Sequence, residues 1–147
     1  MIKEQIISDL KSAMKNADQF RLGVLRLLSS AMQNESIALR GKGESEELTD
    51  ENVIAVLKKE AKKRKESIAM YGDAGRNDLK ENEEKELAVI KEYLPPELSD
   101  EEIKNVIEPI IAAGDRDFAS VMKSAMAEFK GRADGKVVSE MIRSLLS

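Results

Sequence analysis

Apolar residues in this chain recur every three to four positions, in segments that run from the first residues to the last. Ile2, Ile6 and Leu10 show this spacing near the start, and Val137 and Met141 repeat it near the end. Such spacing places the apolar side chains on one face of an α-helix, whereas a half-buried strand would alternate apolar and polar residues. No segment alternates convincingly. The sequence therefore predicts an all-α protein.

Glycines, prolines and capping residues divide the helical segments. Leu94-Pro95-Pro96 ends the fourth segment, because proline lacks an amide donor and restricts the residue before it. We predict that this Pro-Pro hinge joins an N-terminal four-helix domain, residues 1–94, to a C-terminal three-helix tail domain, residues 95–147. The predicted helices cover approximately residues 2–16, 19–40, 50–71, 77–93, 100–113, 116–130 and 137–146, and the sixth starts after either Asp115 or Asp117 as its cap.

The composition limits both the core and the chemistry. Aromatic residues make up only 3% of the 147 residues, which favours a helical core of Leu, Ile, Val and Met. The chain has no cysteine and no histidine, so disulfides, Cys/His zinc sites, thiol nucleophiles and Ser-His-Asp triads are excluded. No apolar run reaches the roughly 18 residues of a membrane span, and the N-terminus lacks a signal-peptide core. We expect a cytoplasmic protein without membrane contact, metal or cofactor.

The segment from Lys130 to Lys136 breaks the helical pattern with two glycines. Gly131 is predicted to be a left-handed C-cap, and Asp134 the N-cap of the last helix. Gly135 completes the predicted turn. The same seven residues hold three cations, so the turn combines a sharp change of direction with concentrated charge.

Cations also flank this turn at a spacing of seven residues, which places each pair on one side of its helix. The net charge is −4, so contact with nucleic acid requires a local basic patch. We call the flanking cations and the arginine of the turn the basic rim, and predict that they contact three or four phosphates. The basic rim comprises Lys123, Lys130, Arg132, Lys136 and Arg143.

The third helical segment carries a second group of cations. Lys58, Lys62 and Lys65 share one flank and form a secondary candidate face for phosphate, with a solvated helix face as the alternative interpretation. Arg64 falls instead on the apolar stripe, where an unpaired charge is strongly unfavourable. We predict a structural ion pair between Arg64 and Glu86, with Glu83 and Glu35 as alternative partners.

No pattern indicates a catalytic centre. Gly41-Lys42-Gly43 lacks the glycine spacing and the Lys-Ser/Thr end of a phosphate-binding loop. Carboxylate pairs such as Asp115 and Asp117 have no pocket to raise a pKa, and no nucleophile has an evident base beside it. The residues alone therefore predict a protein that binds and does not catalyse.

Motifs spread over nearly the whole chain nevertheless carry a family resemblance. The most specific are Tyr93-Leu94-Pro95-Pro96-Glu97-Leu98-Ser99 and, further on, Lys130-Gly131-Arg132-Ala133-Asp134-Gly135-Lys136. Others lie at residues 24–28, 33–35, 63–68, 76–79 and 121–126. With these motifs the chain resembles the YqeY family of small bacterial proteins. That family is related to the helical and tail domains of the B subunit of tRNA-dependent amidotransferases.

The resemblance implies an all-α protein with an N-terminal helical domain and a three-helix tail. In the amidotransferase the tail domain helps to hold the tRNA, and the family is labelled as a carbon–nitrogen ligase with glutamine as amido-N-donor. This chain has no glycine/serine-rich amidase core and no room for an ATP-dependent cradle, so the activity itself is not carried over. The tRNA-facing surface can be carried over, at Lys123, Lys130, Arg132 and Lys136.

The leading hypothesis is thus a non-catalytic tRNA-binding accessory protein. The alternative is a protein-interaction adaptor that uses the charged third helix or the tail. Two departures from the family pattern reduce the positive charge of the tail. Ala119-Ser120 and Ala127-Glu128 stand where members of the family often have Gly-Lys and Pro-Lys.

Overall fold

The computed structural model describes residues 1–147 and contains seven helices and no strand, which confirms the predicted all-α class. The helices are α1 (Ile2–Lys15), α2 (Gln19–Gly41), α3 (Asp50–Asp73), α4 (Asn77–Lys91), α5 (Asp100–Ala112), α6 (Phe118–Phe129) and α7 (Gly135–Leu146). None of them combines the length and the apolar character that crossing a membrane requires. The chain divides into two compact units, Met1–Leu94 and Pro95–Ser147.

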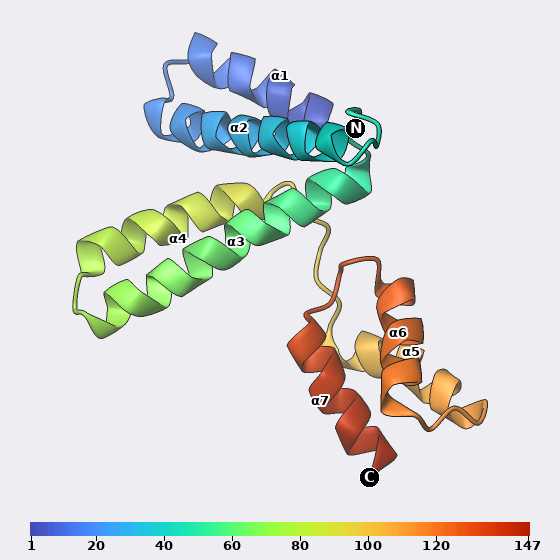
Figure 1. The fold of residues 1–147 in the computed structure, drawn as a ribbon. Coiled ribbons are helices and arrows are strands. Elements are labelled where there is room, and N and C mark those ends of the chain that lie inside the picture. The colour runs from blue at the N-terminus through green and yellow to red at the C-terminus, as the bar shows by residue number, and fades with distance from the viewer. The chain divides into compact units, whose positions relative to one another are not determined.

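The N-terminal unit consists of two helical hairpins (Figure 1). A short turn joins α1 to α2, and Asp18 caps α2 by accepting a hydrogen bond from the Arg21 amide at 3.1 Å. A second short turn, with Gly75 at φ 70°, joins α3 to α4. Helices joined by such short connections pack as antiparallel neighbours, which is how both hairpins lie.

All four helices contribute to the core of this unit. Ile6, Leu25, Leu28, Leu57 and Ile90 are completely buried. Burying a side chain of this size stabilises the fold by about 1.5–3 kcal/mol relative to leaving it in water. The core explains why the apolar stripes of the four segments fall where they do.

The C-terminal unit has a separate core of its own. A capping box opens α5: the Ser99 hydroxyl accepts from the Glu102 amide at 3.2 Å, and the Glu102 carboxylate accepts from the Ser99 amide at 3.3 Å. Ile107 on α5, Val121 on α6 and Ile142 on α7 are completely buried against one another's helices. The remaining buried members are Ile103, Ala125, Phe129, Ala133 and Val138.

Candidate nucleic-acid interface

The corner between α6 and α7 is built from two successive left-handed residues. Lys130 ends α6 at φ 48° and ψ 42°, and Gly131 follows at φ 81°. The left-handed conformation thus begins one residue before the predicted Gly131. Asp134 caps α7 and accepts a hydrogen bond from the Lys136 amide at 3.1 Å. Because the helix starts directly after this cap, Gly135 is the first residue of α7 and does not belong to the turn, contrary to our prediction.

Hydrogen bonds fix this corner to the segment that leads into α5. The Leu98 amide donates to the Arg132 carbonyl at 2.9 Å. Arg132 in turn donates from Nε to the Pro96 carbonyl at 3.0 Å. We predicted Arg132 as a phosphate contact, but its Nε–H group is hydrogen-bonded within the protein and the residue is only half-exposed. Sequence reasoning missed this role, although it had singled out both segments as motifs.

The other members of the basic rim are exposed. Lys123, Lys130 and Lys136 form no ion pair in the structure, so no carboxylate neutralises them. Arg143 is also exposed, and its guanidinium lies 5.2 Å from the centre of the Phe118 ring. A guanidinium at this distance over an aromatic face is held by a cation–π interaction.

Contacts between α6 and α7 show how these cations lie. A Cβ atom added to Gly135 would stand 3.9 Å from the Met122 methyl and 4.0 Å from the Met126 methyl, so these three residues form the seam between the helices. At about 100° per residue, Lys123 lies beyond the methionines as seen from the core. Lys136 and Arg143 lie beyond Gly135 in the same way. Lys130 follows Lys123 seven residues later as the left-handed C-cap of α6.

The two helices are antiparallel neighbours (Figure 1). By helical angle Lys123 on α6 and Lys136 and Arg143 on α7 therefore share one face, on the two sides of the apolar seam. The exposed Lys130 stands next to them, at the left-handed end of α6. On the helical wheel, Glu140 of α7 is the acidic residue closest to this face. Glu128 of α6 lies about 140° around its helix from Lys123. Glu128 therefore lies away from the face that carries Lys123.

Arg64 is held by three carboxylates in the N-terminal unit. The residue is 8% exposed, and its side chain donates from Nη1 to Glu60 at 2.8 Å and from Nε to Glu86 at 3.2 Å, while Glu83 lies 3.9 Å from Nε. The structure brings Arg64 and Glu86 together, and Glu35 is not among its partners. Glu60, only 7% exposed, was missed, although its position four residues before an arginine on one helix is a recognisable signal. Burial, and then the neighbouring Glu86 charge, raise the pKa of Glu83.

The secondary basic face lies in different surroundings from the basic rim. Lys58 is half-buried, whereas Lys62 and Lys65 are exposed. The hairpin partner α4 carries several acidic residues along its length: Asp78, Glu81, Glu83, Glu84 and Glu86. This acidic neighbour offsets the lysines of α3, which favours the solvated-face interpretation over a phosphate site.

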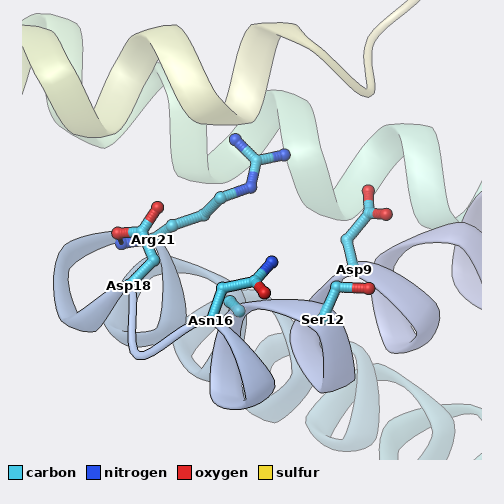
Figure 2. A pocket seen from close by; sticks show the side chains of 6 residues that line it. Asp9, Ser12, Asn16, Asp18 and Arg21 are labelled. Carbon is cyan, nitrogen blue, oxygen red and sulfur yellow. Dashed lines mark hydrogen bonds between the residues drawn. The ribbon is translucent and has the colours of Figure 1, made fainter.

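A small pocket opens beside the turn between α1 and α2. It is lined by Asp9, Ser12, Ala13, Asn16, Asp18 and Arg21. Figure 2 shows Arg21 and Asp9 extending to the same side of the hairpin. There the Tyr93 hydroxyl donates to Asp9 at 2.5 Å and accepts from Arg21 at 3.1 Å.

This hydrogen-bonded group ties the end of α4 to the first hairpin. Arg21 also pairs with Glu92 at 2.8 Å, and that contact raises the pKa of the guanidinium. Burial, together with the hydrogen bond to Asp9, raises the pKa of Tyr93 to about 12, so the phenol stays protonated at neutral pH. Asp18 serves as a cap, and Asp9 and Arg21 make these contacts, so the charged residues of the pocket have a structural role.

Comparison with known proteins gives a consistent result. A family model described as Yqey-like protein matches residues 3–146. "Altered inheritance of mitochondria protein 41, mitochondrial" from Pyrenophora tritici-repentis is 27% identical over 99% of this chain and 81% of its own length. The protein of the same name from Saccharomyces cerevisiae is 30% identical over 87% of this chain and 68% of its own length. An uncharacterized protein of Schizosaccharomyces pombe is 30% identical over 67% of this chain and 73% of its own length.

Proposed function

This chain belongs to the Yqey-like protein family, and from that premise we propose that it is a non-catalytic accessory protein that binds tRNA through its C-terminal unit. One observation carries the proposal: Lys123, Lys130 and Lys136 are exposed and unpaired by any carboxylate, on α6, at its C-cap and in the first turn of the neighbouring α7. Lysines placed in this way can neutralise the phosphates of a nucleic-acid backbone.

The charge distribution favours the basic rim, and not the secondary basic face on α3, as the RNA-binding surface. The chain is acidic overall, with a net charge of −4, so general attraction to RNA is ruled out. The rim face has one nearby acid, Glu140, whereas α3 packs against α4, which carries more acidic than basic residues. An RNA backbone would therefore meet a positive field at the α6–α7 face.

The proposal includes a hinge between the two units. Pro95 and Pro96 have no amide donor, so neither can extend α4. Beyond them, Arg132 and Leu98 fasten the chain to the C-terminal unit. Flexibility confined to this short stretch would let the C-terminal unit adjust to a bound RNA. The expected location is still the cytoplasm, and it remains a prediction because two of the relatives are mitochondrial by name.

Binding of fluorescently labelled, uncharged tRNA at a series of salt concentrations tests the proposal. Contact with three or four phosphates predicts that log K falls with log salt at a slope of about −2 to −4. Replacing Lys123, Lys130 and Lys136 by Glu should abolish binding. A matched control replaces three exposed lysines elsewhere, Lys11, Lys15 and Lys42, by Glu. Failure of the unmodified protein to bind tRNA at low salt, or an equal loss in the control, would contradict the proposal.

A single-site pair refines the same test. Glu140→Lys adds positive charge beside the basic rim and should tighten tRNA binding. Glu128→Lys makes the same change in charge on the other side of α6 and should have a smaller effect. Equal effects of the two variants would mean that net charge, and not the basic rim, governs binding.

The alternative function is an adaptor for a protein partner, and the half-buried Met122 and Met126 in the seam favour it, because methionine surfaces adapt to different partners. Recovery of a stoichiometric protein partner that tRNA does not displace would support the adaptor. For the family's carbon–nitrogen ligase label, the test is ammonia transfer to misacylated tRNA by the purified chain, and we expect none.

A further inference from the structure

The basic rim has charge but offers no ring on which an unpaired base could stack. Residues 95–147 contain only two aromatic residues, Phe118 and Phe129. Phe129 is 1% exposed, and the face of Phe118 is covered by the Arg143 guanidinium at 5.2 Å. Proteins that hold single-stranded RNA without reading its sequence depend on aromatic platforms in addition to charge. This surface has only the charge.

The rim also lacks the side chains that read base edges. The single amide side chain of residues 95–147 is Asn105, which lies on α5, and there is no glutamine. Arg132 donates from Nε to the Pro96 carbonyl, which holds its guanidinium against the protein. The Ser139 hydroxyl donates to the Lys136 carbonyl. Arg143 lies over the Phe118 ring, and the other rim cations are lysines, which meet phosphate as point charges.

The cations stand in two pairs, one on each of two antiparallel neighbouring helices. Lys136 and Arg143 are about 10 Å apart along α7, and Lys123 precedes the C-cap Lys130 by the same number of residues on α6. Between the pairs lies the uncharged seam of Met122, Met126 and Gly135. A double helix likewise presents two charged strands on either side of a groove, and the minor groove of A-form RNA is wide and shallow.

We infer that the ligand of the basic rim is double-helical RNA, held across its minor groove by one cation pair on each phosphate strand, and that unpaired RNA is not the ligand. This inference rests on the proposed function and adds the class of RNA and the mode of contact. Binding follows the shape of the helix and is independent of base sequence. The narrower minor groove of B-form DNA brings the phosphate rows closer together, so a DNA duplex fits less well.

The test measures binding of the full chain to labelled probes at one low salt concentration. The probes are two RNA duplexes of about 16 base pairs with unrelated sequences, a DNA duplex of one of those sequences, an unstructured single-stranded RNA with the same number of phosphates, and uncharged tRNA. We expect the two RNA duplexes to bind within about twofold of each other and at least about fivefold more tightly than the single strand or the DNA duplex.

Each outcome bears on a different statement. Single-stranded RNA that binds as tightly as the RNA duplex overturns this inference but leaves the proposed tRNA binding intact. A large difference in affinity between the two RNA duplexes also overturns it, because such a difference would require sequence-specific contacts with the bases. Absence of binding to every probe, tRNA included, overturns both the inference and the proposed function.

Variants confined to one cation pair test the two-strand contact. The double variant Lys123→Ala with Lys130→Ala removes the positive charges associated with α6. The double variant Lys136→Ala with Arg143→Ala removes those of α7. If each cation pair holds one strand, either double variant should lower the slope of log K against log salt by about 2 for the RNA duplex. Loss of slope with only one of the two double variants would contradict contact across the groove. Circular dichroism of each variant verifies that the helices are intact, and Lys136→Ala alone retains the Arg143–Phe118 contact if the double variant unfolds.

Discussion

Arg64 illustrates how one buried cation organises its surroundings at the scale of single residues. Glu60 and Glu86 hold it with short, charged hydrogen bonds, and Glu83 lies further away at 3.9 Å. Removing a buried charge's partners is destabilising by about 3–5 kcal/mol when the charge is left alone. Arg64, however, has three carboxylates, so the loss of any one of them leaves it paired. The three are not equivalent, because burial and Glu86 raise the pKa of Glu83.

This difference predicts opposite effects for two neighbouring substitutions. A carboxyl whose pKa is raised by folding binds its proton more tightly in the folded state. The stability it contributes is present below its ordinary pKa of 4.5 and is lost as pH rises through the folded value. Glu83→Gln should therefore raise the melting temperature at pH 7 and have less effect near pH 4. Glu86→Gln should lower the stability by about 1–3 kcal/mol, because it removes a charged hydrogen bond. A lower melting temperature for Glu83→Gln at pH 7 would show that its attraction to Arg64 prevails.

Tyr93 provides a second prediction at this scale. Its hydroxyl bridges Asp9 and Arg21, which are 84 and 72 residues away in the chain. Tyr93→Phe should lower the free energy of unfolding by about 1–2 kcal/mol, as expected for the loss of hydrogen bonds to charged groups. Tyr71 is also half-buried but its hydroxyl makes no hydrogen bond, so Tyr71→Phe is the matched control and should be nearly neutral. Urea denaturation of both variants measures the difference.

At the scale of elements, the α6–α7 corner separates two glycines that the sequence presents as alike. Gly131 has a φ of 81°, a conformation that a side chain disfavours by about 1–2 kcal/mol. Gly135 opens α7 with an ordinary φ, and a Cβ there would only touch two flexible methionine methyls at 3.9 and 4.0 Å. Glycine at this position loses chain entropy without a conformational need.

Alanine substitutions should consequently act in opposite directions. Gly131→Ala should lower the stability of the C-terminal unit by about 1–2 kcal/mol. Gly135→Ala should leave it unchanged or raise it by up to about 1 kcal/mol. Thermal unfolding followed by circular dichroism distinguishes the two. Equal destabilisation would mean that Gly135 is needed for close packing in the seam.

The elements also show what a sequence can and cannot predict. An N-cap acts within the first turn of its own helix, so a local sequence pattern can indicate it. Four helices begin directly after such a residue: Asp18, Thr49, Ser99 and Asp134. Apolar periodicity is local too, and it predicts all seven helices. The bonds that position the corner join Arg132 to Pro96, 36 residues away, and no periodicity encodes such a distance. For the same reason the sequence does not indicate that Glu92 is the partner of Arg21, because the two residues lie far apart in the chain.

At the scale of the whole molecule, two hydrophobic cores lie in two compact units. Each unit contains its own fully buried residues, so a cavity in one core should leave the other intact. Ile142→Ala in α7 and Leu57→Ala in α3 remove side chains that are completely buried. Each should destabilise its own unit by about 2–5 kcal/mol.

Hydrogen exchange followed by mass spectrometry measures this separation. Ile142→Ala should accelerate exchange in peptides from residues 95–147 and leave those from residues 1–94 unchanged, and Leu57→Ala should do the reverse. Acceleration throughout the chain by both variants would indicate a single cooperative unit. That outcome would also remove the support for a hinge at Pro95 and Pro96.

An NMR titration tests directly whether the C-terminal unit meets RNA through the α6–α7 face. Uncharged tRNA would be added to the isotope-labelled full chain while the backbone amides are followed. We expect that amides of α6, the corner and the start of α7, including Lys123, Lys130 and Lys136, shift or broaden first, and that added salt reverses the change. Perturbations confined to residues 1–94, or none at low salt, would contradict this expectation.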